Sequence, residues 1–152
     1  MTINNESCRE RESDVPDCST NIDLEVISAL HLPKPNRNER GEIIDPYVRV
    51  RLYEDNKVTQ SIKTSTVIDN GFYPVWNHSV QFTCQNPDFS YFLFEVYDED
   101  TLTADDFIGQ FAIFVSNMQE GYAWIPLFDK HGRRLHYAMV FLKVHIDKQC
   151  NF

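Results

Sequence analysis

Apolar and polar residues alternate along much of the chain after residue 21. Ile22, Leu24 and Val26 alternate with Asp23 and Glu25. Successive side chains of a strand point to opposite faces, so this alternation predicts strands with one buried face. The same pattern recurs at 48–52, 80–84, 92–96 and 140–146, and more weakly at 58–67, 108–115 and 122–127. The pattern therefore predicts about eight strands.

Turn-forming residues separate these ranges, among them Asn70-Gly71, Asn86-Pro87, Gly121 and Gly132. No stretch has convincing helical periodicity, although residues 116–120 could form one turn. Short antiparallel strands bury their apolar faces by packing as two sheets. We therefore predict an all-β fold, namely an eight-stranded antiparallel β-sandwich over residues 21–148. Residues 1–20 would be a disordered acidic tail and residues 149–152 a C-terminal tail.

Three long polar connections, at 31–45, 68–76 and 98–106, carry most of the conspicuous acidic residues. Strands of a sandwich alternate in direction, so every second loop emerges at the same end, and these three could converge. Crowded carboxylates repel each other unless water screens them or a cation lies among them. Calcium takes 6–8 oxygen ligands at roughly 2.3–2.6 Å and suits such a cluster. A solvated acidic turn is the alternative.

Composition narrows the possible functions. The chain has 152 residues, enough for one domain with a core, and a formal net charge of −9. This charge argues against nucleic-acid binding, which needs a basic surface. No apolar stretch reaches the roughly 20 residues that span a bilayer. We expect the four cysteines to be reduced thiols of a cytoplasmic protein, with Cys84 in the core and Cys8, Cys18 and Cys150 in the tails.

Four motifs in order resemble the C2 domain family of calcium- and lipid-binding sandwiches. They are Asp45-Pro46-Tyr47-Val48, the segment Asn70 to Trp76, the pair Asp98 and Asp100, and Asp106-Phe107-Ile108-Gly109. The stretches Leu32 to Asn36, Ile43 to Pro46, Asn70-Gly71-Phe72 and Gly121-Tyr122 are most similar to the C-terminal C2 domain of phosphoinositide-specific phospholipase C. The resemblance covers about residues 21–147 and implies the permuted (type II) strand order of those phospholipases.

The resemblance also implies a calcium site. Its ligands would be the side chains of Asp45, Asp98, Asp100 and Asp106, the main-chain carbonyl of Ile43, and Asp69 in the second loop. Many calcium-binding members carry a further aspartate early in the first loop, where this chain has Lys34 to Arg40. We therefore expect fewer ions or weaker binding than in a fully acidic site.

Lipid contacts are expected beside this site. Lys34, Arg37 and Arg40 of the first loop could touch anionic lipid, and Leu102 could enter the headgroup region. Phe72 and Tyr73 could do the same, or could pack against Pro74 and Trp76. A basic strand face with Arg49, Arg51, Lys57 and Lys63 could hold phosphoinositides, but an ordinary exposed face is the preferred interpretation.

These observations predict a monomeric module that binds anionic phospholipid membranes when calcium rises, and that is otherwise cytoplasmic. Protein partners are possible and nucleic acid is not expected. One alternative is a fragment of a phosphoinositide-specific phospholipase C, whose separate catalytic barrel would not fit in 152 residues. Another is a calcium-independent protein-interaction domain. No nucleophile or zinc motif is present, so we do not expect the chain itself to be an enzyme.

Overall fold

A computed structural model describes residues 17–35 and 43–151. Its strands are β1 (Asp17–Leu30), β2 (Pro46–Glu54), β3 (Lys57–Lys63), β4 (Val75–Cys84), β5 (Tyr91–Asp98), β6 (Asp106–Phe114), β7 (Gly121–Phe128) and β8 (Arg134–Asn151). One 3-10 turn, η1 (Val115–Asn117), follows β6. The predicted all-β fold with eight strands is confirmed. Across the described ranges, no helix is long and apolar enough to cross a bilayer.

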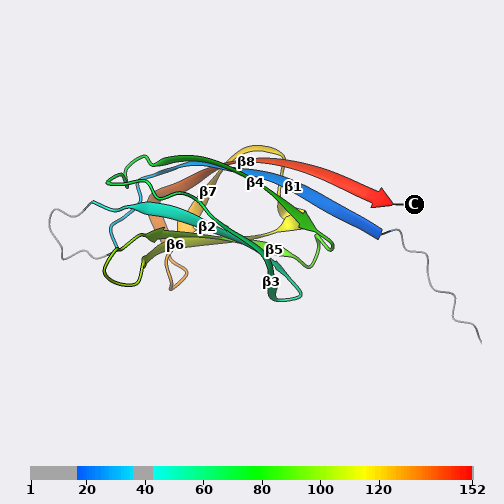
Figure 1. The fold of residues 1–152 in the computed structure, drawn as a ribbon, viewed down its shortest axis with the longest axis horizontal. Helices are drawn as coiled ribbons and strands as arrows, with labels where there is room; N and C mark the ends of the chain where they lie inside the picture. The colour runs from blue at the N-terminus through cyan, green and yellow to red at the C-terminus, as the bar shows by residue number, and fades with distance from the viewer. Residues whose placement is uncertain (1–16, 36–42, 152) are drawn as a thin grey trace, which may run out of the picture.

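The strands form two packed sheets (Figure 1). Their order is β3-β2-β5-β6-β7-β8-β1-β4, and every neighbouring pair is antiparallel. The pair β6 and β7 is joined at one position only, Gln110 opposite Phe128. This near-break separates a sheet β3-β2-β5-β6 from a sheet β7-β8-β1-β4. The assignment to the permuted C2 topology stays a prediction.

The core consists of the alternating apolar positions that predicted the strands. Val48, Val50, Phe92, Phe94 and Val96 from the first sheet are fully buried. They face Ile22, Leu24, Val26, Phe82, Val140 and Leu142 from the second sheet, which are buried to the same extent. The rings of Phe82 and Phe92 meet edge to face with centroids 4.9 Å apart. Cys84 is fully buried, as predicted.

The first and last strands extend beyond the predicted boundaries. β1 pairs with β8 from Asp17 opposite Asn151, whereas β4 joins β1 only from Thr20 onward. Residues 17–19 and 149–151 therefore form a two-stranded ribbon past the sandwich (Figure 1). Of the predicted N-terminal tail, residues 1–16 lie outside the described residues.

A disulfide joins Cys18 to Cys150 in this ribbon. The two residues are directly opposite in the β1–β8 register. The prediction that both are reduced tail thiols is therefore wrong. The reason is that backbone pairing continues past the last buried side chains, so the apolar pattern ends before the strands do. Cys8 lies outside the described residues.

Candidate functional site

Four connections lie at one end of the sandwich. Strands β1, β3, β5 and β7 run toward this end, and β2, β4, β6 and β8 start from it. The connections are therefore the one between β1 and β2, of which residues 31–35 and 43–45 are described, and those at 64–74, 99–105 and 129–133. The Cys18–Cys150 ribbon lies at the opposite end (Figure 1). The prediction that the three loops share one end is confirmed. The fourth, a hairpin between β7 and β8, was not singled out from the sequence.

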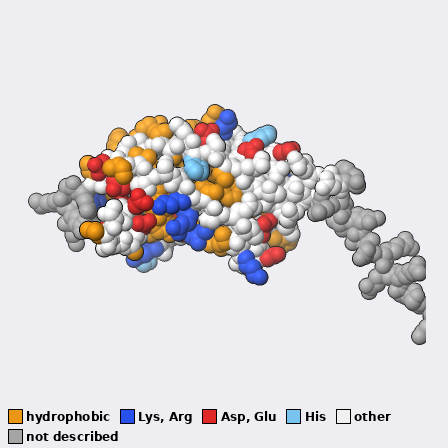
Figure 2. Space-filling view, viewed as in Figure 1, with side chains coloured by type: hydrophobic (Ala, Val, Ile, Leu, Met, Phe, Trp, Pro, Cys, Tyr) orange, Lys and Arg blue, Asp and Glu red, His pale blue; other side chains and the backbone are white. Residues whose placement is uncertain are grey.

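A hollow of about 420 Å³ opens between the first and third of these loops. Five of the six predicted metal-binding residues line it, namely Ile43, Asp45, Asp98, Asp100 and Asp106, together with Lys34, Pro35, Glu99, Thr101 and Thr103. We call this hollow the acidic cup. Acidic and hydrophobic side chains gather side by side at this end of the molecule (Figure 2).

Backbone hydrogen bonds hold the base of the cup together. The N–H of Asp45 donates to Oδ1 of Asp98 over 2.8 Å, and the N–H of Glu99 donates to the carbonyl of Asp45 over 2.9 Å. The N–H of Asp69 donates to Oδ1 of Asp45 over 2.7 Å. Asp69 therefore adjoins the cup through its backbone, but it is not among the residues that line the cup.

The tip of the third loop is shaped by Asp100. Its Oδ1 accepts the N–H of Leu102 over 3.1 Å, and its Oδ2 accepts the hydroxyl of Thr103 over 2.7 Å. The hydroxyl bond from Thr103, followed by the bond from the Leu102 N–H, lowers the pKa of Asp100 below its ordinary value. The turn leaves Leu102 at the tip with its side chain 92% exposed.

Asp105 has a structural role that the sequence did not reveal. Its Oδ2 accepts the hydroxyl of the buried Tyr47 over 2.6 Å, and its Oδ1 accepts the N–H of Asp100 over 3.1 Å. The bond from Tyr47 lowers the pKa of Asp105. Burial, reinforced by the same bond, raises the pKa of Tyr47. Asp105 thus fixes the third loop to strand β2.

The cup has the donor chemistry for calcium, since carboxylate and carbonyl oxygens are the ligands that this ion takes. Within residues 17–35 and 43–151, however, no three acidic, histidine or cysteine side chains converge into a group that could hold a metal ion. Lys34, a cation, lines the same hollow as the carboxylates. The calcium roles of the predicted ligands therefore stay predictions.

The predicted lipid-contacting side chains of the second loop are exposed. Phe72 is 70% and Tyr73 49% exposed, so neither packs into the core beside Trp76. Phe72 instead meets the ring of His31 edge to face, with centroids 4.7 Å apart. Two bonds with Asn70 brace Tyr73, whose N–H donates to Oδ1 over 2.9 Å and whose carbonyl accepts from Nδ2 over 3.0 Å. Arg37 and Arg40 lie outside the described residues.

The basic strand face is occupied by internal contacts. Arg51 pairs with the buried Glu95. Arg49 lies over the ring of Tyr97, 5.1 Å from its centroid. Lys63 lies 3.9 Å from the ring centroid of Tyr47 and 3.1 Å from Glu99 Oε1. These contacts favour the interpretation of an ordinary strand face.

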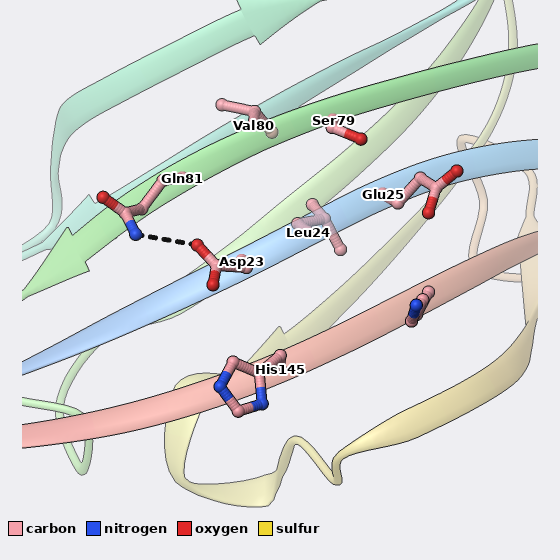
Figure 3. Close-up of a pocket in the computed structure, with 8 residues that line it drawn as sticks. Asp23, Leu24, Glu25, Ser79, Val80, Gln81 and His145 are labelled. Atoms are coloured by element: carbon pink, nitrogen blue, oxygen red, sulfur yellow. Dashed lines mark hydrogen bonds between the residues drawn. The ribbon is translucent and has the colours of Figure 1, made fainter.

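A shallow groove crosses the outer face of β4, β1 and β8 (Figure 3). Six of its eight lining residues are polar or charged, among them Asp23, Glu25, Gln81, Lys143 and His145. Nε2 of Gln81 donates to Oδ1 of Asp23 over 2.8 Å, as the dashed line in Figure 3 marks. His145 pairs with Glu120 outside the groove, at 3.1 Å. These contacts are those of a solvated sheet face.

Comparisons with known proteins agree with this architecture. The family model of the C2 domain matches residues 20–127. The chain is 39% identical over 126 residues to bovine 1-phosphatidylinositol 4,5-bisphosphate phosphodiesterase delta-4, covering 83% of this chain and 16% of that protein. It is 33% identical over 129 residues to the human delta-3 protein, covering 85% of this chain and 16% of the relative. The chain thus spans about a sixth of the length of these relatives.

Solved structures show the same fold. A C2 domain of plant Extended Synaptotagmin 1 superposes with a TM-score of 0.72 at 20% identity, covering 90% of this chain and 98% of that domain. PLC21 from L. pealei superposes with a TM-score of 0.69 at 27% identity, covering 88% of this chain and 16% of that protein. The family resemblance predicted from the four motifs is therefore confirmed, and the chain belongs to the C2 domain family.

Proposed function

We propose that this domain binds anionic phospholipid membranes in response to calcium, and that the acidic cup is the calcium site. The observation that supports this most is the placement of Asp45, Asp98, Asp100 and Asp106 around one hollow. Asp45 ends the first loop, whereas Asp98, Asp100 and Asp106 lie in the third loop or at the strand ends that flank it. Like charges so close together gain stability when a divalent cation lies between them.

The carbonyl of Ile43 would add an oxygen from the first loop, and Asp69 would approach from the second. Because the carboxylates do not form a metal-holding group in the structure, the proposal requires them to turn about their side-chain bonds. Lys34 would be displaced from the cup in the same step. Bound calcium would reverse the local potential, and lipid phosphate could then approach the cup.

Exposed apolar side chains at the same end support membrane contact. Leu102, Phe72 and Tyr73 project from the third and second loops. Ile43 and Ile68 are also exposed, at 59% and 64%. Lys34, Arg37 and Arg40 would attract anionic headgroups. The domain would then be cytoplasmic at resting calcium and peripheral on membranes when calcium rises.

The test is co-sedimentation with phosphatidylserine vesicles, with calcium and with chelator, for the wild type and for Asp98→Asn/Asp100→Asn. We expect calcium-dependent binding that the double substitution abolishes. The melting temperature of the wild type should also rise with calcium, because a ligand of the native state stabilises it.

The matched control is Asp55→Asn/Asp88→Asn. It removes the same charge from two exposed positions, one in the β2–β3 turn and one in the β4–β5 connection, both at the opposite end. It should keep both responses. Equal vesicle binding with calcium and with chelator would contradict calcium dependence.

A second candidate is that the chain is the regulatory domain of a phosphoinositide phospholipase C, favoured by its similarity to part of the delta-4 and delta-3 phosphodiesterases. The domain alone should then leave phosphoinositides intact, and the parent transcript would encode a catalytic domain upstream.

A third candidate is calcium-independent protein binding. It would be supported if millimolar calcium produced neither heat in calorimetry nor a rise in melting temperature.

A further inference from the structure

The hairpin between β7 and β8 is basic, although the chain as a whole carries a formal charge of −9. Residues 129–134 contain three full positive charges, on Lys130, Arg133 and Arg134, against one carboxylate, Asp129. All three cationic residues are exposed. We call residues 129–134 the basic hairpin.

The carboxylate of Asp129 is engaged by the hairpin itself. Its Oδ1 accepts the N–H groups of His131 and Arg133, each over 2.9 Å, and its Oδ2 accepts Nε of Arg133 over 2.9 Å. The N–H of Gly132 donates to the Asp129 carbonyl over 3.0 Å, with Gly132 at a φ of +76°. These bonds give the hairpin a defined shape and leave its surface charge dominated by cations.

Two hollows adjoin the hairpin, and Arg133 lines both. One, of about 420 Å³, reaches toward Lys34 and Pro35 and includes Asp106, an acidic-cup residue. The other, of about 650 Å³, is lined by Pro33, Asp129, Arg133, Arg134, Leu135 and His136. The second hollow contains no carboxylate except the engaged Asp129. It is therefore the better site for an anion.

We propose that the basic hairpin is a calcium-independent binding site for the phosphomonoester groups of inositol lipid headgroups. Guanidinium groups present forked donors that match the oxygens of a phosphate. A phosphomonoester carries about −1.5 to −2 charges, more than the single charge of a phosphodiester. Arg133 and Arg134 line the second hollow, and Lys130 lines the first hollow beside it. Together these cations suit such a compact anion.

The position of the hairpin favours a phosphomonoester group on a membrane lipid over one on a free, soluble compound. The hairpin lies at the same end as Leu102 and Phe72, because β7 ends and β8 begins there. A membrane surface that met those apolar tips would also come close to the hairpin. This site goes beyond the proposed calcium-dependent binding and does not depend on it.

The experiment measures binding in chelator to phosphatidylcholine vesicles that contain phosphatidylinositol bisphosphate. Phosphatidylserine vesicles of equal total charge and soluble inositol trisphosphate serve as the other probes. The wild type should bind the bisphosphate vesicles more tightly than the phosphatidylserine vesicles. Soluble inositol trisphosphate should compete with the vesicles.

Lys130→Ala/Arg134→Ala should weaken the binding about 30-fold, given the attraction of each basic residue near an anionic surface. The matched control, Lys143→Ala/Lys148→Ala, removes two exposed lysines of β8 distant from the hairpin and should leave the binding unchanged. If the double substitution lowers the melting temperature, the single Lys130→Ala, at an exposed position, should still weaken binding about fivefold.

Two results would overturn the proposal. One is that, with chelator present, the wild type binds the bisphosphate vesicles no more tightly than the phosphatidylserine vesicles. This result would overturn the proposal even if the protein bound soluble inositol trisphosphate. The other is an equal loss of binding in the hairpin and control variants. Asp98→Asn/Asp100→Asn should still bind the bisphosphate vesicles when chelator is present. A failure of the calcium proposal can therefore be distinguished from a failure of this one.

Discussion

Individual side chains at the loop end differ in how far the sequence could reveal their roles. Asp45, Asp98, Asp100 and Asp106 lie in recognisable motifs, and all four line the acidic cup. Asp105 could not be identified in this way. Its contact with Tyr47 joins residues 58 positions apart and depends on how loop and strand meet in space. The sequence therefore predicted the residues that line the cup better than the hydrogen bonds that hold its loop in place.

The bond between Tyr47 and Asp105 can be removed by Tyr47→Phe. We expect the free energy of unfolding to fall by about 1 kcal/mol, the usual net value of a hydrogen bond. The pKa of Asp105 should rise toward its ordinary value of about 3.9, because the bond from Tyr47 is the main cause of its lowering. Urea titration and carboxyl NMR would measure the two effects.

The pH dependence follows from the direction of this shift. A lowered folded-state pKa means that Asp105 contributes stability above its unfolded value, and that the contribution is lost as pH falls through the folded value. Tyr47→Phe should therefore weaken the acid dependence of stability below about pH 4. Tyr122→Phe, at an exposed ring, serves as the control. An unchanged Asp105 pKa in Tyr47→Phe would contradict the expected role of the bond.

Strands were the most predictable elements, because burial of one face imposes a period of two on the sequence. The pattern cannot report pairing where neither face is buried. For this reason the β1–β8 ribbon with Cys18 and Cys150 was missed, although its backbone pairing continues that of the sheet. Spacing alone gave no reason to join cysteines 132 residues apart.

Opening the Cys18–Cys150 bond should lower stability. The bond closes a loop of 132 residues and so restricts the unfolded chain strongly. We expect the reduced protein to lose about 2–4 kcal/mol of unfolding free energy. Melting temperatures with and without dithiothreitol would measure this, and Cys18→Ser/Cys150→Ser should melt like the reduced wild type under both conditions. A reducing environment would also favour the open form.

Gly109 on β6 controls how closely the two sheets approach where β6 meets β7. A Cβ at this position would lie 2.9 Å from Leu135 Cδ1 and 3.1 Å from Leu127 Cβ. Gly109→Ala should therefore destabilise the protein by about 1–3 kcal/mol through overpacking. Ala112→Val adds volume at an exposed position of the same strand and is the control. Equal denaturation midpoints for the two variants would argue against close packing here.

At the scale of the whole molecule, alternating strand direction correctly predicted that distant loops share one end. It could not predict which side chains turn inward. Asp69 shares that end with the acidic cup but is not among the residues that line it, although Ile43 and the four other aspartates are. Loop backbone conformation, such as the positive φ of 53° at Asp69, decides this, and no period in the sequence encodes it.

The orientation on a membrane can be tested with one polarity-sensitive dye at two sites. We expect Leu102→Cys, at the loop end, to show a blue shift with phosphatidylserine vesicles and calcium. Asp55→Cys, in the β2–β3 turn at the opposite end, should show none. A Cys8→Ser background keeps the labelling specific, since Cys84 is buried and Cys18 and Cys150 are joined. Equal shifts at both sites would exclude docking through the loop end.

The ribbon that joins β1 to β8 has a mechanical consequence. A force applied between the two ends of the chain would pass from Cys18 to Cys150 through a covalent bond. Residues 19–149 would carry none of this load, so stretching the ends apart would leave both sheets intact until a reductant cut the link. Single-molecule pulling should then show no unfolding event for the oxidised protein and a distinct one after reduction.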